Sequence, residues 1–201
     1  ATTDALLLND LDLRLGILRE VELGDPMGAL TMYRDVIGRE PGNADAREGL
    51  DRLAEIDATA EAAIDLLEPL YRQAQDLVKV AGLFERRIAL RPNASERAGL
   101  LMELASTWET QIGDPMAALA VLKRALGDDP ADGRILDEIE RLAQATGGWA
   151  ELSGVAEAVA AREQVPREVA RGLLLRASRW YIEGLDDPQN AATCLRGALE
   201  I

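Results

Sequence analysis

The sequence predicts an all-helical protein, and three observations lead to that prediction. Alanine, leucine, glutamate and arginine dominate the 201 residues while aromatic residues make up 3%, a composition that favours helix over strand. Apolar residues recur at helical spacing through most of the chain. The stretch GDPMGAL at 24–30 returns as GDPMAAL at 113–119, and Asp187-Pro188 repeats part of it. We therefore expect about ten or eleven antiparallel helices.

The Gly-Asp-Pro motif has the chemistry of a joint between two helices. Gly113 can adopt the left-handed backbone conformation that ends one helix, and Asp114 can accept hydrogen bonds from free N–H groups of the next. Pro115 suits the first helical turn. Asp25 and Asp187 occupy the matching positions of the other two joints. All three aspartates are therefore expected at helix N-termini rather than in a catalytic pair.

The apolar spacing predicts five helix pairs and one additional helix. The first pair covers about 9–42, around the joint at Gly24. The additional helix covers about 43–57 and begins at Asn43, a capping residue followed by an amphipathic pattern. The other four pairs cover about 61–94, 98–132, 133–166 and 170–201.

This spacing resembles the tetratricopeptide repeat (TPR), a helix-turn-helix unit of 34 residues. Leu15-Gly16 reproduces the Leu-Gly pair of that family. The stretch 61–94 matches without gaps, through residues on both sides of its turn and a closing proline: Ile64, Leu67, Tyr71, Leu77, Val80, Phe84, Ile88 and Pro92. The resemblance covers about nine tenths of the chain and implies a right-handed α-solenoid, in which stacked helix pairs share one core.

In the resembling family, the first helix of each pair lines a concave face that commonly holds a peptide or a helix of a partner protein. The positions that match this groove and suit partner contact are Arg72, Met102, Glu109, Arg141, Arg176 and Arg179. One subclass of the family grips a C-terminal carboxylate with Lys and Asn. That clamp is missing here, because residues such as Asp65 and Pro69 occupy its positions.

Most aromatic residues are expected to pack in the shared core. Trp180 is the exception, because its neighbour Tyr181 occupies the core position and two adjacent residues cannot share one helix face. Trp180 is therefore expected either at the surface or between two helix pairs. Cys194, inside the last helix, is expected to be a small packing residue with no redox role.

The charge and the residue inventory exclude several classes of site. A formal net charge of −14 argues against binding nucleic acid through its phosphates. With no histidine and one cysteine, the chain has no imidazole base, no His metal ligand, no Cys-rich zinc site and no internal disulfide. Neither a phosphate-binding Gly-rich loop nor a Ser nucleophile elbow is found. No catalytic residue, cofactor or metal is therefore expected.

Features of the whole chain suggest its origin and location. No apolar run approaches the length of a membrane span and no secretory signal is found, which favours a cytoplasmic location. The chain begins ATTDALL, without methionine, and stops at RGALEI inside a helical pattern, so we expect a piece of a longer protein. Only Lys79 and Lys123 are lysines among the 22 basic residues, a usage typical of a bacterial genome rich in G and C.

Two functions stay open at the level of the sequence. The favoured one is a non-catalytic interaction scaffold that binds a peptide or partner protein on the concave face. The alternative is a helical accessory or regulatory domain of an enzyme whose catalytic part lies elsewhere. In the first case, the groove arginines would hold acidic groups of the partner and Met102 would be an apolar anchor. The acidic surface could instead attract a basic partner.

Overall fold

Helices form every regular element in the described part of the chain. A computed structural model describes residues 2–201, with side chains from Leu6 onward. It contains eleven α-helices and one π-helical turn within those residues, which confirms the predicted all-α fold and its number of helices. The chain divides into two compact units, Ala1–Leu90 and Arg91–Ile201.

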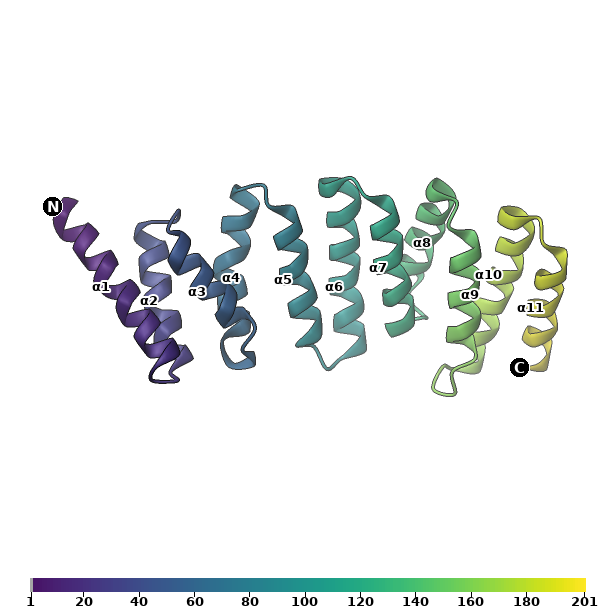
Figure 1. Ribbon diagram of the computed structural model, residues 1–201. Helices are drawn as coiled ribbons and strands as arrows, with labels where there is room; N and C mark the ends of the chain where they lie inside the picture. Colours follow the sequence, from purple (N-terminus) through teal and green to yellow (C-terminus); the bar gives the residue numbers. More distant parts are fainter. Residues whose placement is uncertain (1) are drawn as a thin grey trace. The chain divides into compact units, whose positions relative to one another are not determined.

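The first unit contains five helices that pack in chain order. α1 packs on α2, α2 on α3, α3 on α4 and α4 on α5. Figure 1 shows that α1 and α2 run in opposite directions, as do α4 and α5. The helices are α1 (Thr2–Val21), α2 (Pro26–Arg39), α3 (Ala44–Ala54), α4 (Asp57–Gln73) and α5 (Leu77–Ala89).

The second unit contains six α-helices and the π-helical turn η1, which continues α6. The long helix formed by α6 and η1 packs on α7, and α7 packs on α8 and α9. α10 packs on both α9 and α11. The elements are α6 (Ala94–Ser106), η1 (Thr107–Ile112), α7 (Pro115–Asp128), α8 (Gly133–Thr146), α9 (Trp149–Ala160), α10 (Arg167–Leu185) and α11 (Pro188–Glu200).

The three predicted joints are capped as their chemistry requires. Asp25 Oδ1 accepts from the third amide of its helix at 2.9 Å, and Asp114 Oδ1 does so at the same distance. Asp187 Oδ1 accepts from the matching amide of α11 at 3.1 Å. Gly24 and Gly113 have left-handed backbone conformations, with φ of 59° and 84°. The prediction that these aspartates begin helices is confirmed.

A helix at Ala44–Ala54, α3, separates the first joint from the stretch 61–94. Asn43 caps it, since its Oδ1 accepts from the amide of Ala46 at 3.0 Å. α3 falls inside the stretch where the sequence predicts an additional helix. The division of the chain into five repeats remains a prediction.

Two glycines let the ring of Tyr33, in the core of the first unit, approach the backbones of α1 and α3. Tyr33 of α2 is fully buried. A Cβ atom placed on Gly49 would lie 2.4 Å from the Tyr33 ring, and one on Gly16 would lie 2.7 Å from it. Gly16 belongs to the Leu-Gly pair of the sequence, and its role is therefore to admit this ring between α1 and α3.

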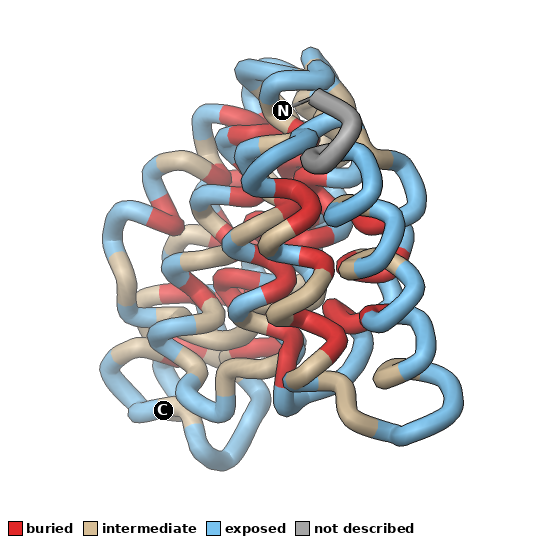
Figure 2. Tube along the Cα trace, turned by 90° about the vertical axis from the view of Figure 1, so that its left-hand side faces the viewer, coloured by how far each residue is buried: buried red, intermediate tan, exposed pale blue. Residues whose placement is uncertain are grey.

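The core of each unit lies on the faces that its helices turn toward one another. Figure 2 shows the buried residues along these faces, with exposed residues on the outer sides of the helices. Cys194 is buried in α11, and burial raises the pKa of its thiol to about 11.

Trp180 of α10 is part of that core, with 1% of its surface exposed, and this excludes a position at the surface. Its ring lies 6.5 Å from that of Trp149 in α9, and its Nε1 donates to Glu140 of α8 at 3.1 Å. Tyr181, expected in the core, is half-buried, and its hydroxyl donates to Glu157 at 2.6 Å. Both neighbours are accommodated because α10 has α9 on one side and α11 on the other.

Candidate functional site

The structure places five of the six predicted groove residues in the second unit. Met102 comes from α6, Glu109 from η1, Arg141 from α8, and Arg176 and Arg179 from α10. The sixth, Arg72, lies on α4 of the first unit, where its Nε donates to Glu68 at 3.0 Å. The second unit therefore holds the candidate site.

Two neighbouring hollows are lined by residues of α6, η1, α7, α8, α9 and α10. The first, called the apolar hollow here, has a volume of about 370 Å³. Its buried lining residues are apolar, and its exposed lining residues are charged or polar. The lining residues are Met102, Ala105, Ser106, Glu109, Thr110, Leu122, Glu138, Arg141 and Leu142.

The π-helical turn shapes one wall of the apolar hollow. In η1 the helix is wider than in α6, and the hydroxyls of Thr107 and Thr110 donate to backbone carbonyls one turn earlier, at 3.0 and 2.7 Å. Wide turns of this kind occur often at functional sites. The sequence pattern did not predict it, because TWETQI keeps ordinary helical spacing and the extra width shows only in the backbone.

Arg141 stands between the two hollows and is already held by two carboxylates. Its Nη1 and Nη2 donate to the two oxygens of Glu109 at 2.8 and 2.6 Å. Its Nε and Nη2 donate to Glu138 at 2.9 and 2.8 Å. Hydrogen bonds to Glu109, followed by those to Glu138, raise the pKa of Arg141, and those from Arg141 lower the pKa of Glu109. The sequence places Glu109 and Arg141 in one groove without indicating that they would bind each other.

The second hollow, called the tryptophan hollow here, has a volume of about 470 Å³. It shares Arg141 with the apolar hollow and adds the edge of the Trp149–Trp180 pair. Its lining residues are Asp137, Glu140, Arg141, Gln144, Trp149, Arg179, Trp180 and Glu183.

One carboxylate oxygen in the tryptophan hollow serves three donors. Glu140 Oε1 accepts from Arg176 Nη1 at 2.7 Å, from Arg179 Nη2 at 2.9 Å and from the indole of Trp180 at 3.1 Å. Two guanidinium groups thus share one carboxylate, and Arg179 is half-exposed. Because a guanidinium has five N–H donors, this pair retains capacity for a further acceptor. The sequence did not identify Glu140, since nothing in its spacing separates it from other surface acids.

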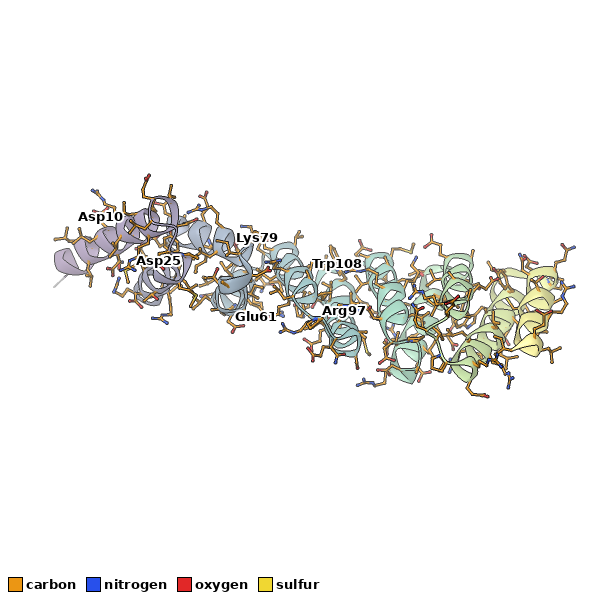
Figure 3. The ribbon with its side chains drawn as sticks, turned by 90° about the horizontal axis from the view of Figure 1, so that it is seen from below. Asp10, Asp25, Glu61, Lys79, Arg97 and Trp108 are labelled. Carbon is orange, nitrogen blue, oxygen red and sulfur yellow. The ribbon has the colours of Figure 1, made fainter. Side chains whose placement is uncertain are left out.

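A third hollow, of about 380 Å³, lies in the first unit beside α3 and α5. Its polar centre is Tyr71, whose hydroxyl donates to Asp51 at 2.5 Å and accepts from Lys79 Nζ at 3.0 Å. Burial, followed by the hydrogen bond to Asp51, raises the pKa of Tyr71 to about 12. Lys79, labelled in Figure 3, also lies 4.7 Å from the centre of the Tyr71 ring. These three groups satisfy one another, so we assign them to the packing of α3 against α4 and α5.

The described residues contain no group of three or more His, Cys, Asp or Glu placed to hold a metal ion. Across residues 2–201, no helix combines the length and the apolar character that a bilayer crossing requires.

The helices, which pack on one another in chain order, define an all-α protein of antiparallel helices. A search of solved structures finds a crystal structure of a thermophilic TPR protein from Thermus thermophilus, with 18% identity over 96% of this chain and 100% of that chain and a TM-score of 0.30. No protein-family model matches the chain, and no curated protein matches it.

Proposed function

We propose that this protein is a non-catalytic scaffold whose second unit binds an extended peptide segment of a partner protein. The observation that carries the proposal is the pair of hollows on either side of Arg141. One has an apolar floor, and the other has two guanidinium groups that share a single carboxylate. An extended peptide can place two nearby side chains in two such hollows.

The contacts of each arginine suggest which one meets the partner. Arg141 is held by Glu109 and Glu138, so its charge is balanced within the chain and it separates the two hollows. Among the described carboxylates, Arg176 and Arg179 have only Glu140 within 3 Å, and Glu183 lies 3.9 Å from Arg179. An acidic side chain of the peptide would therefore bind Arg176 and Arg179, because arginine suits bidentate contact with a carboxylate.

The apolar hollow would take a large apolar side chain of the same peptide. Met102 is an adaptable side chain that can follow the shape of a ligand, and Leu122 and Leu142 supply the floor. Arg72 is not part of this surface, and its predicted contact with a partner is a separate proposal for the first unit.

Selection of random peptides on the immobilised 201-residue chain tests this function. We expect selected peptides to carry an acidic residue close to a large apolar one. Titration calorimetry should then show that Arg179→Glu and Met102→Glu each weaken binding by about 2 kcal/mol, the cost of losing a central contact. The matched control is Arg196→Glu, which makes the same charge change on α11, outside both hollows.

The salt dependence of binding distinguishes an acidic peptide from a basic one. If the selected peptides are basic, bind more strongly to Arg179→Glu and lose affinity at high salt, then the acidic surface recruits the partner and the proposal is wrong. Equal affinity for wild type, Arg179→Glu and Met102→Glu would also contradict it.

A further inference from the structure

The first three helices of the two units match each other in sequence, 89 positions apart. GDPMGAL at 24–30 matches GDPMAAL at 113–119, and LDRLAE at 50–55 matches IERLAQ at 139–144. α1, α2 and α3 therefore correspond to α6 with η1, α7 and α8. In each set the middle helix packs on the other two. Residues 89 positions apart thus occupy equivalent places in the two sets.

An ion pair is repeated along with these helices. In the second unit, the carboxylate of Glu109 accepts from two nitrogens of Arg141, at 2.8 and 2.6 Å. In the first unit, the carboxylate of the equivalent Glu20 accepts from two nitrogens of Arg52, at 2.6 and 2.9 Å. The equivalence of the two sets therefore extends from the helices to the side chains that join them.

A tyrosine of the first unit donates a third hydrogen bond to its carboxylate. The hydroxyl of Tyr33 donates to Glu20 Oε2 at 2.5 Å. The Tyr33 ring is fully buried and lies against Gly16 and Gly49. Burial, followed by the hydrogen bond to Glu20, raises the pKa of Tyr33. The chain thus contains a neutral phenol that is bound by a carboxylate, and an arginine holds that carboxylate in place.

The second unit has Leu122 in the place of Tyr33. Leucine has neither a ring nor a hydroxyl, so this position supplies no third donor to Glu109. An ionised carboxylate has about four acceptor sites, and Glu109 therefore retains capacity beyond its two bonds from Arg141. The apolar hollow opens at this place, since Leu122, Glu109 and Arg141 all line it.

The remaining lining of the apolar hollow indicates how deep a ring could enter. Ala105 and Glu138 line it in the places of Gly16 and Gly49. A Cβ atom at either glycine would lie within 3 Å of the Tyr33 ring. A ring in the second unit would therefore lie farther out than Tyr33 does, at a depth that a side chain of another molecule can reach.

We propose that the apolar hollow binds a tyrosine side chain of the partner peptide, with its ring against Leu122 and Leu142 and its hydroxyl donating to Glu109. The choice of tyrosine rests on the proposed function, in which this hollow takes a large apolar side chain. Tyrosine combines a large apolar body with a hydroxyl that needs a partner when it is buried. Phenylalanine would supply the ring alone, and leucine would supply neither the ring nor the donor.

Titration of the 201-residue chain with p-cresol, the free side chain of tyrosine, tests this contact without any peptide. We expect p-cresol to shift NMR signals of backbone amides in η1 and in α7 around Leu122. Toluene, which lacks the hydroxyl, should bind there about tenfold more weakly, the effect of one hydrogen bond to a charged acceptor.

Two carboxylate variants test which group accepts the hydroxyl. Glu109→Met keeps a side chain of similar length without an acceptor, so p-cresol and toluene should bind it equally. Glu138→Met is the matched control, because it changes the other carboxylate that Arg141 binds. It should retain the tenfold preference for p-cresol.

A variant that copies the first unit tests the hollow from the inside. Leu122→Tyr, combined with Ala105→Gly and Glu138→Gly, gives the second unit its own ring and the space for that ring. This variant should bind p-cresol at least tenfold more weakly than wild type does. The two glycine substitutions without Leu122→Tyr are the control and should leave p-cresol binding intact. Circular dichroism verifies that both variants are helical.

The peptides selected on the wild-type chain distinguish failure of this contact from failure of the proposed function. Tyrosine should be their large apolar residue, and its replacement by phenylalanine should weaken binding about tenfold in wild type but not in Glu109→Met. Selected peptides with leucine or methionine in its place would overturn the tyrosine contact and leave the peptide scaffold standing. Binding of p-cresol without selection of any peptide would instead overturn the proposed function and assign the hollow to a small phenol. Equal binding of p-cresol and toluene to wild type would contradict the hydrogen bond to Glu109.

Discussion

Asp186 holds a left-handed backbone conformation that the other two joints assign to glycine. Its φ is 51°, against 59° for Gly24 and 84° for Gly113. In this conformation the Cβ of an L-residue approaches the following carbonyl, which costs roughly 1–2 kcal/mol, although aspartate tolerates it better than most residues. The last joint therefore uses the same geometry at a higher conformational cost.

Two opposite substitutions test this difference. Gly113→Ala should lower the free energy of unfolding by about 1 kcal/mol, because it adds a Cβ at positive φ. Apart from the two residues next to it in the chain, no described atom lies within 4 Å of that Cβ position, so a loss would come from the local backbone. Asp186→Gly should raise the free energy of unfolding by a similar or smaller amount, because it removes a Cβ at positive φ. Urea unfolding followed by circular dichroism measures both changes.

Gly99→Ala is the matched control, because Gly99 lies inside α6 with no described atom near its Cβ position. It should stabilise the protein, since alanine is the better helix former. A Gly113→Ala protein with the stability of the wild type would show that this joint needs no glycine.

At the scale of the helices, ion pairs connect elements that are neighbours in space and about one helix pair apart in sequence. Arg52 of α3 donates to Glu20 of α1 at 2.6 Å, and Arg141 of α8 donates to Glu109 of η1 at the same distance. Arg97, labelled in Figure 3, donates to Asp128 of α7 at 2.6 Å. Such partly exposed pairs contribute roughly 0.2–1 kcal/mol each, so they orient helices more than they stabilise them.

The ion pair between Glu109 and Arg141 makes the free energy of unfolding depend on pH. Hydrogen bonds from Arg141 hold the pKa of Glu109 below its ordinary value of 4.5 in the folded state. The stabilisation is therefore complete above pH 4.5 and is lost as pH falls through the lower pKa of the folded protein. We expect wild type to lose stability between about pH 5 and pH 3 more steeply than Glu109→Gln does. Urea unfolding at a series of pH values measures the slopes.

Glu163→Gln changes an exposed acid in the loop before α10 and serves as the comparison. It measures how far the loss of one acidic charge outside the ion pair changes the slope. Equal slopes for Glu109→Gln and wild type would show that the ion pair does not form in solution.

At the scale of the whole molecule, helices with a neighbour on each side should be more protected than those at the ends. In proteins built of stacked helices, each element contacts only its neighbours, and opening starts where a neighbour is missing. α1 and α11 each leave leucines exposed, whereas Leu67 of α4 and all three leucines of α7 are buried.

Hydrogen exchange followed by mass spectrometry should therefore find amides of α1 and α11 exchanging faster than those of α4 and α7. The measurement belongs at concentrations where the chain has the mass of a monomer. Uniform protection along the dilute chain would contradict this account of how its stability is distributed.

Features that depend on residues close together in the chain could be predicted from the sequence. A Gly-Asp-Pro joint works through hydrogen bonds between residues three apart, and Asn43 caps α3 in the same way, so each can be inferred from a few letters. The helical spacing of apolar residues predicts which face of a helix is buried. The six predicted groove residues were assigned to first helices only through the resemblance to the TPR family.

Which of these groups contact one another depends on how the helices pack. Arg141 is held by Glu109, 32 positions away, and Trp180 is buried because α9 and Glu140 of α8 lie beside it. The wider backbone of η1 and the exposure of the α1 leucines also depend on how the helices pack, and neither follows from a short stretch of sequence. Leu11 and Leu173 each lie 14 residues before the aspartate that caps the next helix, yet Leu11 is exposed and Leu173 is buried. Burial and charge pairing depend on what the chain brings alongside a residue, and that information is spread over all the helices that pack together.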